Sequence, residues 1–438
     1  MNTFLGQSQK LFFVAMIIIA AFMPFWNLGV NIGVGMLAAA WLISADFRSK
    51  IKTFKARPLF WLLPILFLIC LLGLLYSSNQ TEAFKDLGVK LPLLLVPLIF
   101  GSSKVVSRAQ LGVIMKVFIG ACLVACFYCL FMAGYYNVQE GYTLSYFLGR
   151  IFGDTPMLGE YAYFNYEHFT YHYFSTPLKF QPIYFSLFLT LAAYFSIWLA
   201  WENKRVGNSE FTKRGIILFV FFFVIIMLLS SRSQSMVFIF TSVLWAIVWA
   251  IKNKKLILGL SVGGMVVLFG MMMIMFNPIN KSRFTEMVDM ENTYEETEWM
   301  GRSLRLQKWL YALELIKENP VIGVGVGDAP DELMRIYAKN DFHIGLKNKF
   351  NSHNEYLQFA IHSGVLGLLF LLFSLAYPAW VGLKSQKNLF LAFVILFSLS
   401  LITEAMFERT KGLMFFTFFY SILAGFFIYP ETEESLNQ

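Results

Sequence analysis

The chain has 438 residues, of which 58% are hydrophobic and 14% charged, and 48 of them are phenylalanines. A soluble core could not hide so much apolar surface, so the composition excludes a soluble globular protein and indicates a polytopic membrane protein. The formal net charge of +8 would suggest nucleic acid in a soluble chain. In a membrane protein it first reflects the retention of Lys and Arg on the cytoplasmic side, and we expect no nucleic-acid partner.

Apolar runs that predict helices recur along the whole chain. We expect an all-α fold, a polytopic membrane protein with about twelve transmembrane helices, some of them short, because a span needs roughly 20 residues. Neither an internal repeat nor a low-complexity linker separates the runs, so residues 1–438 are predicted to form a single membrane domain. The runs cover residues 11–26, 30–45, 59–76, 87–100, 111–134, 181–201, 215–230, 235–251, 256–276, 355–383, 388–404 and 412–429.

Lys and Arg are distributed unequally between the two sides of the membrane. With the N-terminus inside, the inner segments carry 17 Lys or Arg and the short outer segments carry 6. Basic residues concentrate on the cytoplasmic side, so this asymmetry predicts that both termini are cytoplasmic. Two long loops, residues 135–180 and residues 277–353, are then expected on the outer side.

The outer loop of residues 135–180 is crowded with tyrosines. Aromatic residues at this depth commonly form an interfacial belt, and a sugar-stacking platform is the alternative. His168 and His172 are spaced to share a helical face, but no third ligand is close in the sequence, so we expect no metal site. The four cysteines all fall in apolar segments, which predicts buried packing rather than disulfides.

The outer loop of residues 277–353 is the largest polar insertion. Its middle part predicts an amphipathic helix with Ser303 as its N-cap and Pro320 just beyond its end. Such a helix can lie on the membrane surface, and the glycine-rich residues 323–328 that follow are expected to form a flexible turn. The apolar positions at helical spacing are Leu306, Trp309, Leu310, Leu313 and Ile316.

Three arginines lie where positive charge is unfavourable. Arg302 and Arg305 flank the predicted start of the amphipathic helix, where the helix dipole disfavours cations. An anion between them would resolve this conflict, because helix-start amides and guanidinium groups make a phosphate site, but equally both could face water or lipid headgroups. Arg232 lies in a short outer turn between two apolar runs, and a charge at that depth is a functional candidate unless it snorkels.

The best catalytic candidate stands at the end of the second loop. Ser352 and Glu355 have the spacing of a capping box, which makes His353 the first helical residue. A helix N-terminus disfavours imidazolium, so His353 is predicted to be a proton acceptor near neutral pH. A histidine beside a helix cap is more often structural, and this motif alone does not decide between the two roles.

Charged residues also gather at the outer boundary near the C-terminal end. Glu404 can pair with Arg409 or with another arginine, and we expect a structural ion pair there. Only Lys116 and Lys90 lie well within apolar runs, whereas a transporter usually places ionisable groups in the middle of its spans. The charge collects at one face, which favours surface chemistry over a lipid-glycan flippase or another transporter.

Several motifs together resemble the O-antigen ligase and O-antigen polymerase superfamily. Residues 305–309 (RLQKW) are followed by 319–325 (NPVIGVG), by 352–357 (SHNEYL) and by 364–367 (GVLG). The order of these motifs is specific to that superfamily, and Arg232 at the short outer turn resembles its other arginine.

The resemblance covers roughly residues 180–430 and implies a function. Enzymes of this superfamily move a glycan from undecaprenyl diphosphate to an acceptor hydroxyl on the periplasmic side of the bacterial inner membrane, without a metal or nucleotide. The implied roles are activation of the acceptor hydroxyl by His353 and binding of the donor diphosphate by Arg232 and Arg305, with Arg302 beside them. We expect the supporting residues to be Ser352, Asn354, Glu355, Gln181, Glu404 and Arg409.

We therefore expect a metal-independent glycosyltransferase of lipopolysaccharide biosynthesis, most simply an O-antigen ligase acting on lipid A-core. No cofactor is expected, and membrane lipid is expected among its partners. The sequence does not identify the acceptor, so a polymerase that extends the repeat chain and an oligosaccharyltransferase that modifies protein hydroxyls stay open. One departure is visible, because Gln181 stands before Pro182 where this superfamily often has a histidine.

Overall fold

The computed structural model describes residues 2–44, 46–104, 106–139, 166–205, 209–276 and 301–430. These residues are helical and include no strand, which confirms the predicted all-α class. The helices are α1 (Asn2–Phe22), α2 (Asn27–Ile43), α3 (Phe47–Lys55), α4 (Leu62–Leu74), α5 (Gln80–Lys90), α6 (Pro92–Ser102), α7 (Arg108–Gln139), α9 (Tyr171–Ser175), α10 (Pro182–Arg205), α11 (Ser209–Leu228), α12 (Arg232–Lys252), α13 (Leu256–Phe276), α15 (Gly301–Glu318), α16 (Ala329–Lys339), α17 (His343–Asn348), α18 (Glu355–Lys384), α19 (Asn388–Ser400) and α20 (Thr410–Ile428).

Six of the described helices are long and apolar enough to cross a membrane, namely α7, α10, α12, α13, α18 and α20. A seventh span results if α2 and α3, which meet at a bend of 112°, are taken together. The predicted runs near α1, α4 and α19 correspond to shorter apolar helical segments, Gln7–Phe22, Pro58–Leu74 and Asn388–Ser400. The chain is thus a multi-pass membrane protein, and the predicted number of about twelve spans is not confirmed.

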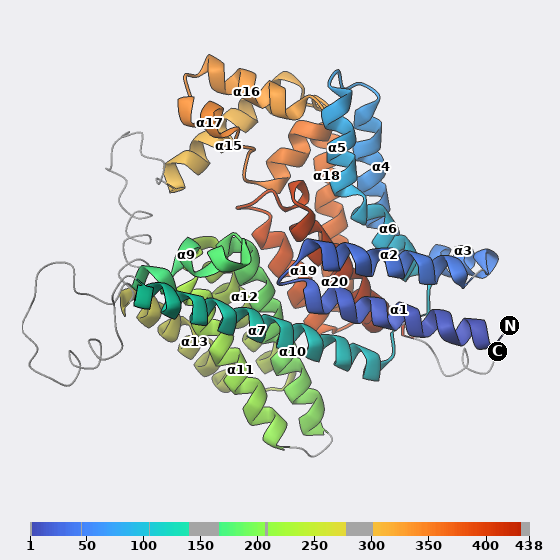
Figure 1. Cartoon of the computed structure of the whole chain (residues 1–438), viewed down its shortest axis with the longest axis vertical. Coiled ribbons are helices and arrows are strands. Elements are labelled where there is room, and N and C mark those ends of the chain that lie inside the picture. The colour runs from blue at the N-terminus through green and yellow to red at the C-terminus, as the bar shows by residue number, and fades with distance from the viewer. Residues whose placement is uncertain are drawn as a thin grey trace, which may run out of the picture. The chain divides into compact units, whose positions relative to one another are not determined.

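Contacts between helices divide the chain into two compact units. Unit 1 contains Met1–Ile19, Asn27–Val113 and Met290–Gln438. It brings N-terminal helices against C-terminal ones, because α18 packs on α4 and α19 while α20 packs on α6 (Figure 1). The grouping into one membrane domain over residues 1–438 stays a prediction.

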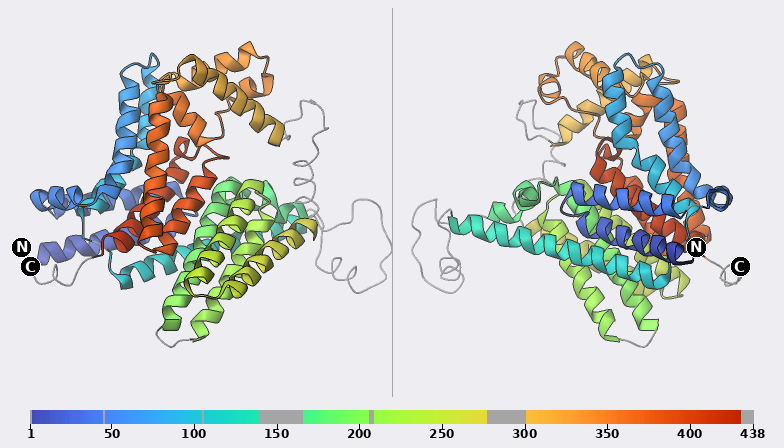
Figure 2. Two further views of the ribbon diagram at one scale, coloured as in Figure 1. Left: turned by 180° about the vertical axis from the view of Figure 1, so that it is seen from behind. Right: turned by 45° about the vertical axis from the view of Figure 1, so that its right-hand side comes forward.

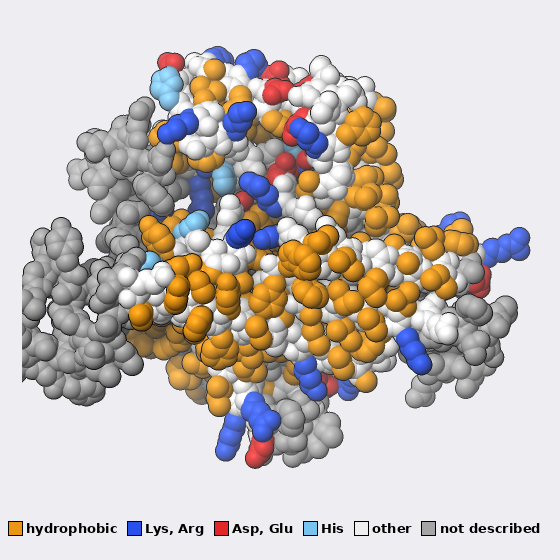
Figure 3. Space-filling model, viewed as in Figure 1, with side chains coloured by type: hydrophobic (Ala, Val, Ile, Leu, Met, Phe, Trp, Pro, Cys, Tyr) orange, Lys and Arg blue, Asp and Glu red, His pale blue; other side chains and the backbone are white. Residues whose placement is uncertain are grey.

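Unit 2 contains Ala20–Trp26 and Ile114–Asp289. Its helices α10 and α11 form one antiparallel pair and α12 and α13 another, and the two pairs pack together (Figure 2). The outward face of α7 is apolar, with Val124, Phe127 and Phe131 exposed by 60%, 59% and 69%, and hydrophobic side chains cover that helix in Figure 3. Such a face suits contact with lipid rather than water. Cys122, Cys126 and Cys129 are free and buried, as predicted for packing residues.

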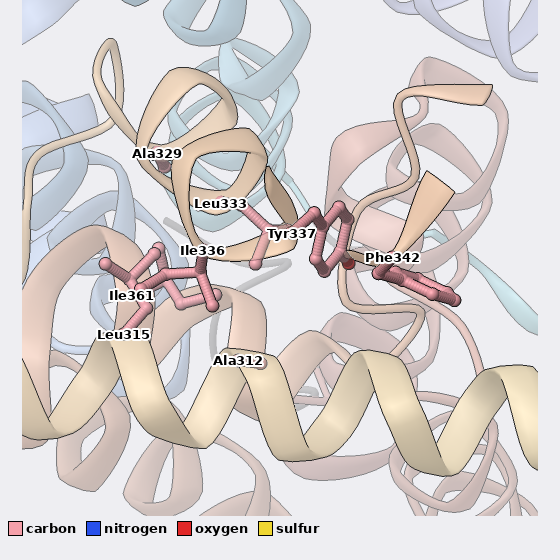
Figure 4. Packing of buried hydrophobic residues seen from close by; sticks show 8 residues of the cluster. All are labelled: Ala312, Leu315, Ala329, Leu333, Ile336, Tyr337, Phe342 and Ile361. Atoms are coloured by element: carbon pink, nitrogen blue, oxygen red, sulfur yellow. The ribbon is translucent and has the colours of Figure 1, made fainter. Parts of the chain in front are cut away.

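In unit 1, α15, α16 and α17 form a small helical layer over the start of α18 (Figure 1). Its core consists of α15 side chains packed against α16, the α16–α17 turn and α18 (Figure 4). The apolar stripe predicted for α15 lies on the other face of the helix, where Leu306, Leu310 and Leu313 are exposed by 47%, 63% and 43%. The core members are Ala312, Leu315, Ala329, Leu333, Ile336, Tyr337, Phe342 and Ile361.

The glycine-rich stretch between α15 and α16 is a fixed junction, not the flexible turn that we predicted. The helix α18 breaks at Gly364, whose φ is 64°. This break frees two carbonyls of α18. The Ile361 carbonyl accepts a hydrogen bond from Val324 N at 2.9 Å, and the His362 carbonyl accepts one from Gly325 N at 3.1 Å. A Cβ on Gly364 would lie 2.1 Å from the carbonyl oxygen of Val321. Only glycine allows this close approach of the two backbones.

Candidate active site

The start of α18 corrects the predicted capping box. The N-cap is Asn354, whose Oδ1 accepts from Leu357 N at 3.2 Å, and the helix begins at Glu355. The Ser352 hydroxyl instead donates to the Asn354 carbonyl at 2.9 Å. The Glu355 carboxylate accepts from Phe407 N at 2.7 Å, so it is engaged by another segment and does not reach back to Ser352. The physical reason for the difference is tertiary competition for the Glu355 side chain.

His353 therefore lies outside the helix, one residue before the N-cap. Its backbone has a φ of 47°, in the left-handed region that few non-glycine residues adopt. Its N–H donates to Asn351 Oδ1 at 3.0 Å, which helps to hold this conformation. A strained backbone of this kind is found where the position of a side chain matters for function.

The imidazole of His353 is paired with a carboxylate. Nδ1 of His353 lies 3.1 Å from Oε2 of Glu404. The Glu404 side chain is only 8% exposed, whereas that of His353 is 27% exposed. Burial opposes ionisation of Glu404, but its hydrogen bond to His353 and the charges of His353, Arg305 and Lys308 together lower its pKa below the usual value. An ionised carboxylate only accepts, so Nδ1 carries the hydrogen of this bond, and in the neutral ring the lone pair is on Nε2.

This pairing decides between the alternatives that the sequence left open for Glu404. It bonds to His353, and no hydrogen bond or ion pair with Arg409 is found among the described residues. Arg409 is exposed at the start of α20, and its charge acts instead on the neighbouring Glu408. Glu404 is thus a partner of the histidine and not a member of the predicted arginine ion pair.

A buried ion cluster anchors the turn that carries Glu404. Lys90 at the end of α5 is fully buried, and its ammonium pairs with Asp86 and, at 2.8 Å, with Glu408. The Glu355 carboxylate accepts a hydrogen bond from the backbone N–H of Phe407, the residue before Glu408. Because both contacts hold residues 406–408, they also fix the place from which Glu404 reaches His353.

Helix α15 supplies positive charge to the same site. Arg305 lowers the pKa of the Glu404 carboxyl, so the guanidinium lies within electrostatic reach of the His353 pair. Lys308, one turn further along, is 5% exposed. Its Nζ lies 4.2 Å from the ring centroid of Phe350, and that ring is 5.8 Å from the His353 ring. Unit 1 therefore brings Arg305, His353 and Glu404 together, as well as a lysine that the sequence analysis missed.

The sequence did contain a signal for Lys308. It stands four and seven residues before Ala312 and Leu315, the two α15 side chains that are completely buried. That spacing puts Lys308 on the inner face of the helix. The more hydrophobic stripe of Leu306, Leu310 and Leu313, on the other face of the helix, instead predicted a helix that can lie on the membrane surface.

Arg302 and Ser303 lie at the beginning of α15. The helix already includes Gly301, so Ser303 is inside it and is not the predicted N-cap. Arg302 is in the first turn, and its side chain lies outside the described ones. Its role as a phosphate ligand stays a prediction. The predicted end is confirmed, because α15 ends at Glu318 and Pro320 follows.

Arg232 and Gln181 belong to unit 2. Arg232 is the first residue of α12, directly after the three-residue turn from α11, and it is 8% exposed. A buried arginine at this turn agrees with the predicted location. Gln181 precedes α10 and is exposed, and its carbonyl accepts from Tyr184 N at 3.1 Å. Functional roles for these two residues stay predictions.

Comparison with known proteins adds an independent observation. Residues 217–372 match the family model described as O-antigen ligase. No curated protein matches the sequence. The matched region includes Arg232, Arg305 and His353 and ends within α18. Residues 217–372 are therefore similar to the O-antigen ligase family, which supports the predicted resemblance to the O-antigen ligase and polymerase superfamily.

Proposed function

We propose that this protein is a glycosyltransferase that moves a glycan from an undecaprenyl diphosphate donor to an acceptor hydroxyl on the periplasmic face of the bacterial inner membrane. The observation that carries the proposal is the His353–Glu404 pair, with Nδ1 and Oε2 3.1 Å apart, beside Arg305 in the matched family region. A partly exposed imidazole with one nitrogen held by a buried carboxylate is equipped for general base catalysis.

The reaction follows from the two ring nitrogens. Nε2 of His353 takes the proton of the acceptor hydroxyl while that oxygen attacks the anomeric carbon of the donor glycan. The bond from this carbon to the diphosphate oxygen breaks, and the diphosphate leaves with the electron pair. Glu404 stabilises the imidazolium that forms, because its negative charge lies at the opposite nitrogen. A single displacement of this kind inverts the anomeric configuration.

The leaving diphosphate gains negative charge as the bond breaks, and fixed cations stabilise that charge most in a site shielded from water. Arg305 supplies a guanidinium near the base, and we assign Arg302, in the first turn of the same helix, to the same diphosphate. For Arg232, in unit 2, binding of a donor phosphate is proposed from the superfamily resemblance alone. Arginine suits this role because its planar fork binds two phosphate oxygens at once. No step needs a metal or a nucleotide.

Within this class, we propose an O-antigen ligase that transfers the glycan to lipid A-core. The family description supports a ligase. A polymerase and a protein oligosaccharyltransferase are the alternatives within the superfamily. A deletion strain separates the three: unattached long lipid-linked chains indicate the ligase, single repeats on the acceptor indicate the polymerase, and unglycosylated protein indicates the third activity.

The chemical proposal is tested with purified protein in proteoliposomes. The donor is a lipid-diphosphate glycan, and attachment of the glycan to lipid A-core is measured. We expect His353→Ala to lower the transfer rate by about a hundredfold or more while the protein stays folded, because general base catalysis is worth about this much. His343→Ala, at the start of α17 in the same layer, is the matched control. A folded His353→Ala protein with full transfer activity would remove His353 from the base role.

A further inference from the structure

The ammonium of Lys308 is buried without a partner that could balance it. Its side chain is 5% exposed, and among the described residues Nζ has neither a hydrogen bond nor an ion pair. Its one close contact is the Phe350 ring at 4.2 Å. A cation over an aromatic ring gains less free energy than it costs to remove an ammonium from water. The contacts of Lys308 therefore offset the cost of its burial only in part.

The charges around Lys308 point to an anionic ligand. Arg305 faces it from its own helix, and Glu404 faces it from the turn before α20. Glu404 is already shared with His353. On the neighbouring helix α16, Arg335 forms an ion pair with Glu318 of α15, and Lys339 forms one with Glu314 of α15. Lys308 therefore shares the negative charge of Glu404 with the His353 ring.

Burial also makes Lys308 easy to deprotonate. Desolvation, followed by the charge of Arg305, lowers the pKa of Lys308 from 10.5 to about 7, and Glu404 offsets this only in part. At periplasmic pH the amine is therefore partly neutral when no ligand is bound. A dianion nearby would favour the ammonium and reverse this shift.

We propose that Lys308 is a ligand of the donor diphosphate, next to Arg305, and that its amine takes up one proton from water as the diphosphate enters. This inference rests on the proposed function and adds a residue and a pH dependence to it. No covalent bond forms or breaks in this step. When the diphosphate leaves, the ammonium loses its counter-ion and the proton returns to water, which favours product release.

The test measures donor binding to the full-length protein in nanodiscs at pH 6 and pH 8.5. The probe is N-acetylglucosaminyl diphosphate of a polyprenol, whose two phosphates are diesters and keep their charge over this range. For the wild type we expect Kd to rise at least tenfold between these pH values, because one proton is taken up on binding. Lys308→Arg keeps its charge, so its Kd should change less than threefold. Lys308→Met should bind weakly at both pH values.

Two controls separate this effect from others. Lys317→Met removes an exposed lysine of the same helix and should keep the wild-type pH dependence. His353→Gln should also keep the wild-type pH dependence of Kd, because the group that titrates is Lys308 and not the histidine. The proposal is wrong if Lys308→Met binds the probe as tightly as the wild type at pH 6, or if the wild-type Kd is the same at both pH values. If Lys308→Met does not fold, the wild type is compared with Lys308→Arg. An equal change of Kd with pH in these two proteins would then contradict the proposal. A wild type that binds no probe at either pH would instead overturn the proposed function.

Discussion

The His353–Glu404 pair assigns different tasks to the two ring nitrogens. Nδ1 donates to the buried carboxylate, and Nε2 is left for the acceptor hydroxyl. The pair also orients the ring, which the strained backbone at His353 alone would not do. Glu404 is thus a positioning residue that acts on the substrate through the histidine.

Glu404→Gln should lower the transfer rate by about a hundredfold with the donor KM unchanged or lower. The amide of glutamine can donate to Nδ1, which places the ring hydrogen on Nε2 and removes the base, and it leaves the imidazolium without a counter-charge. Rates and KM are measured in proteoliposomes at several donor concentrations. Glu314→Gln is the control, since Glu314 binds Lys339 and Asn340 at the end of α16 and not the histidine. An unchanged rate in Glu404→Gln would show that the pair only supports the fold.

Lys308 should make the stability of the ligand-free protein depend on pH. Its pKa is lowered in the folded state to about 7 from 10.5, so the unfolded chain binds more protons between these two values. The wild type should therefore gain stability relative to Lys308→Met as the pH rises from 7 toward 10.5, by about 1.4 kcal/mol per pH unit. Thermal unfolding in detergent at pH 6, 7.5 and 9 measures this. Equal shifts of Tm in both proteins would contradict a buried, easily deprotonated lysine.

At the scale of elements, the active site depends on a junction between a loop and a broken helix. In the loop after α15, Val324 N and Gly325 N donate hydrogen bonds to the two carbonyls that the break in α18 leaves open. In the other direction, Val365 N of α18 donates to the Pro320 carbonyl at 2.8 Å. This junction sets α15, which carries Arg305 and Lys308, relative to α18, whose start carries His353. It also explains why a glycine is needed at position 364 of the motif.

Gly364→Ala should destabilise the protein by several kcal/mol and abolish transfer. The backbone at Gly364 has a φ of 64°, and a Cβ would lie 2.1 Å from the Val321 carbonyl oxygen, so both strain and steric overlap oppose alanine. Gly88→Ala in α5 is the matched control, because a Cβ there meets nothing within 4 Å and alanine favours a helix. Fluorescence-detected gel filtration after heating gives both Tm values. A Gly364→Ala protein with wild-type Tm would contradict the close approach.

Lys90→Met should be strongly destabilising, by about 3–5 kcal/mol, because it leaves Asp86 and Glu408 buried without their cation. The same change should lower transfer even at temperatures where the protein is folded, since the turn of Glu408 also carries Glu404. Lys85→Met is the comparison, for Lys85 is 66% exposed and its pair with Glu82 should contribute less than about 1 kcal/mol. Stability and activity are measured on the same preparations. Wild-type transfer by folded Lys90→Met would separate this ion cluster from the positioning of Glu404.

For the whole molecule, the unequal distribution of Lys and Arg predicts that the active-site layer faces the periplasm. The four cysteines are buried and free, so single exposed cysteines can be labelled over a low background. Lys317→Cys in α15 should react with a membrane-impermeant maleimide in cells with a permeable outer membrane. Lys213→Cys in α11 should react only after the inner membrane is opened. Both residues are exposed, so a reversed pattern would invert the predicted topology.

The surface of α15 connects this topology to the substrate. Leu306, Leu310 and Leu313 form an exposed stripe on the side opposite to Ala312 and Leu315. The predicted apolar periodicity was correct, but the stripe is not used for packing within the unit. An exposed apolar face beside a cationic site suits a ligand with a lipid tail and a phosphate headgroup, which agrees with the proposed donor.

The sequence by itself determined the helical class, the membrane character and the resemblance to the O-antigen ligase family. Composition and apolar runs depend on local residue content, and the superfamily motifs are continuous segments around Arg305, His353 and Gly364, so no tertiary information was needed for them. The end of α15 before Pro320 was also predictable, because proline cannot continue a helix.

Only the tertiary structure decided which groups meet at the site. Glu355 was available for a capping box until Phe407 N, 52 positions away in the chain, bound its carboxylate. From the sequence, Glu404 could have paired with any of several arginines, but in the structure its carboxylate is hydrogen-bonded to His353. Lys308 looked like one polar residue of a surface helix, but the packing of Ala312 and Leu315 buried it. Partners of this kind are brought together by the folding of distant segments, and their competition for one side chain cannot be read from local spacing.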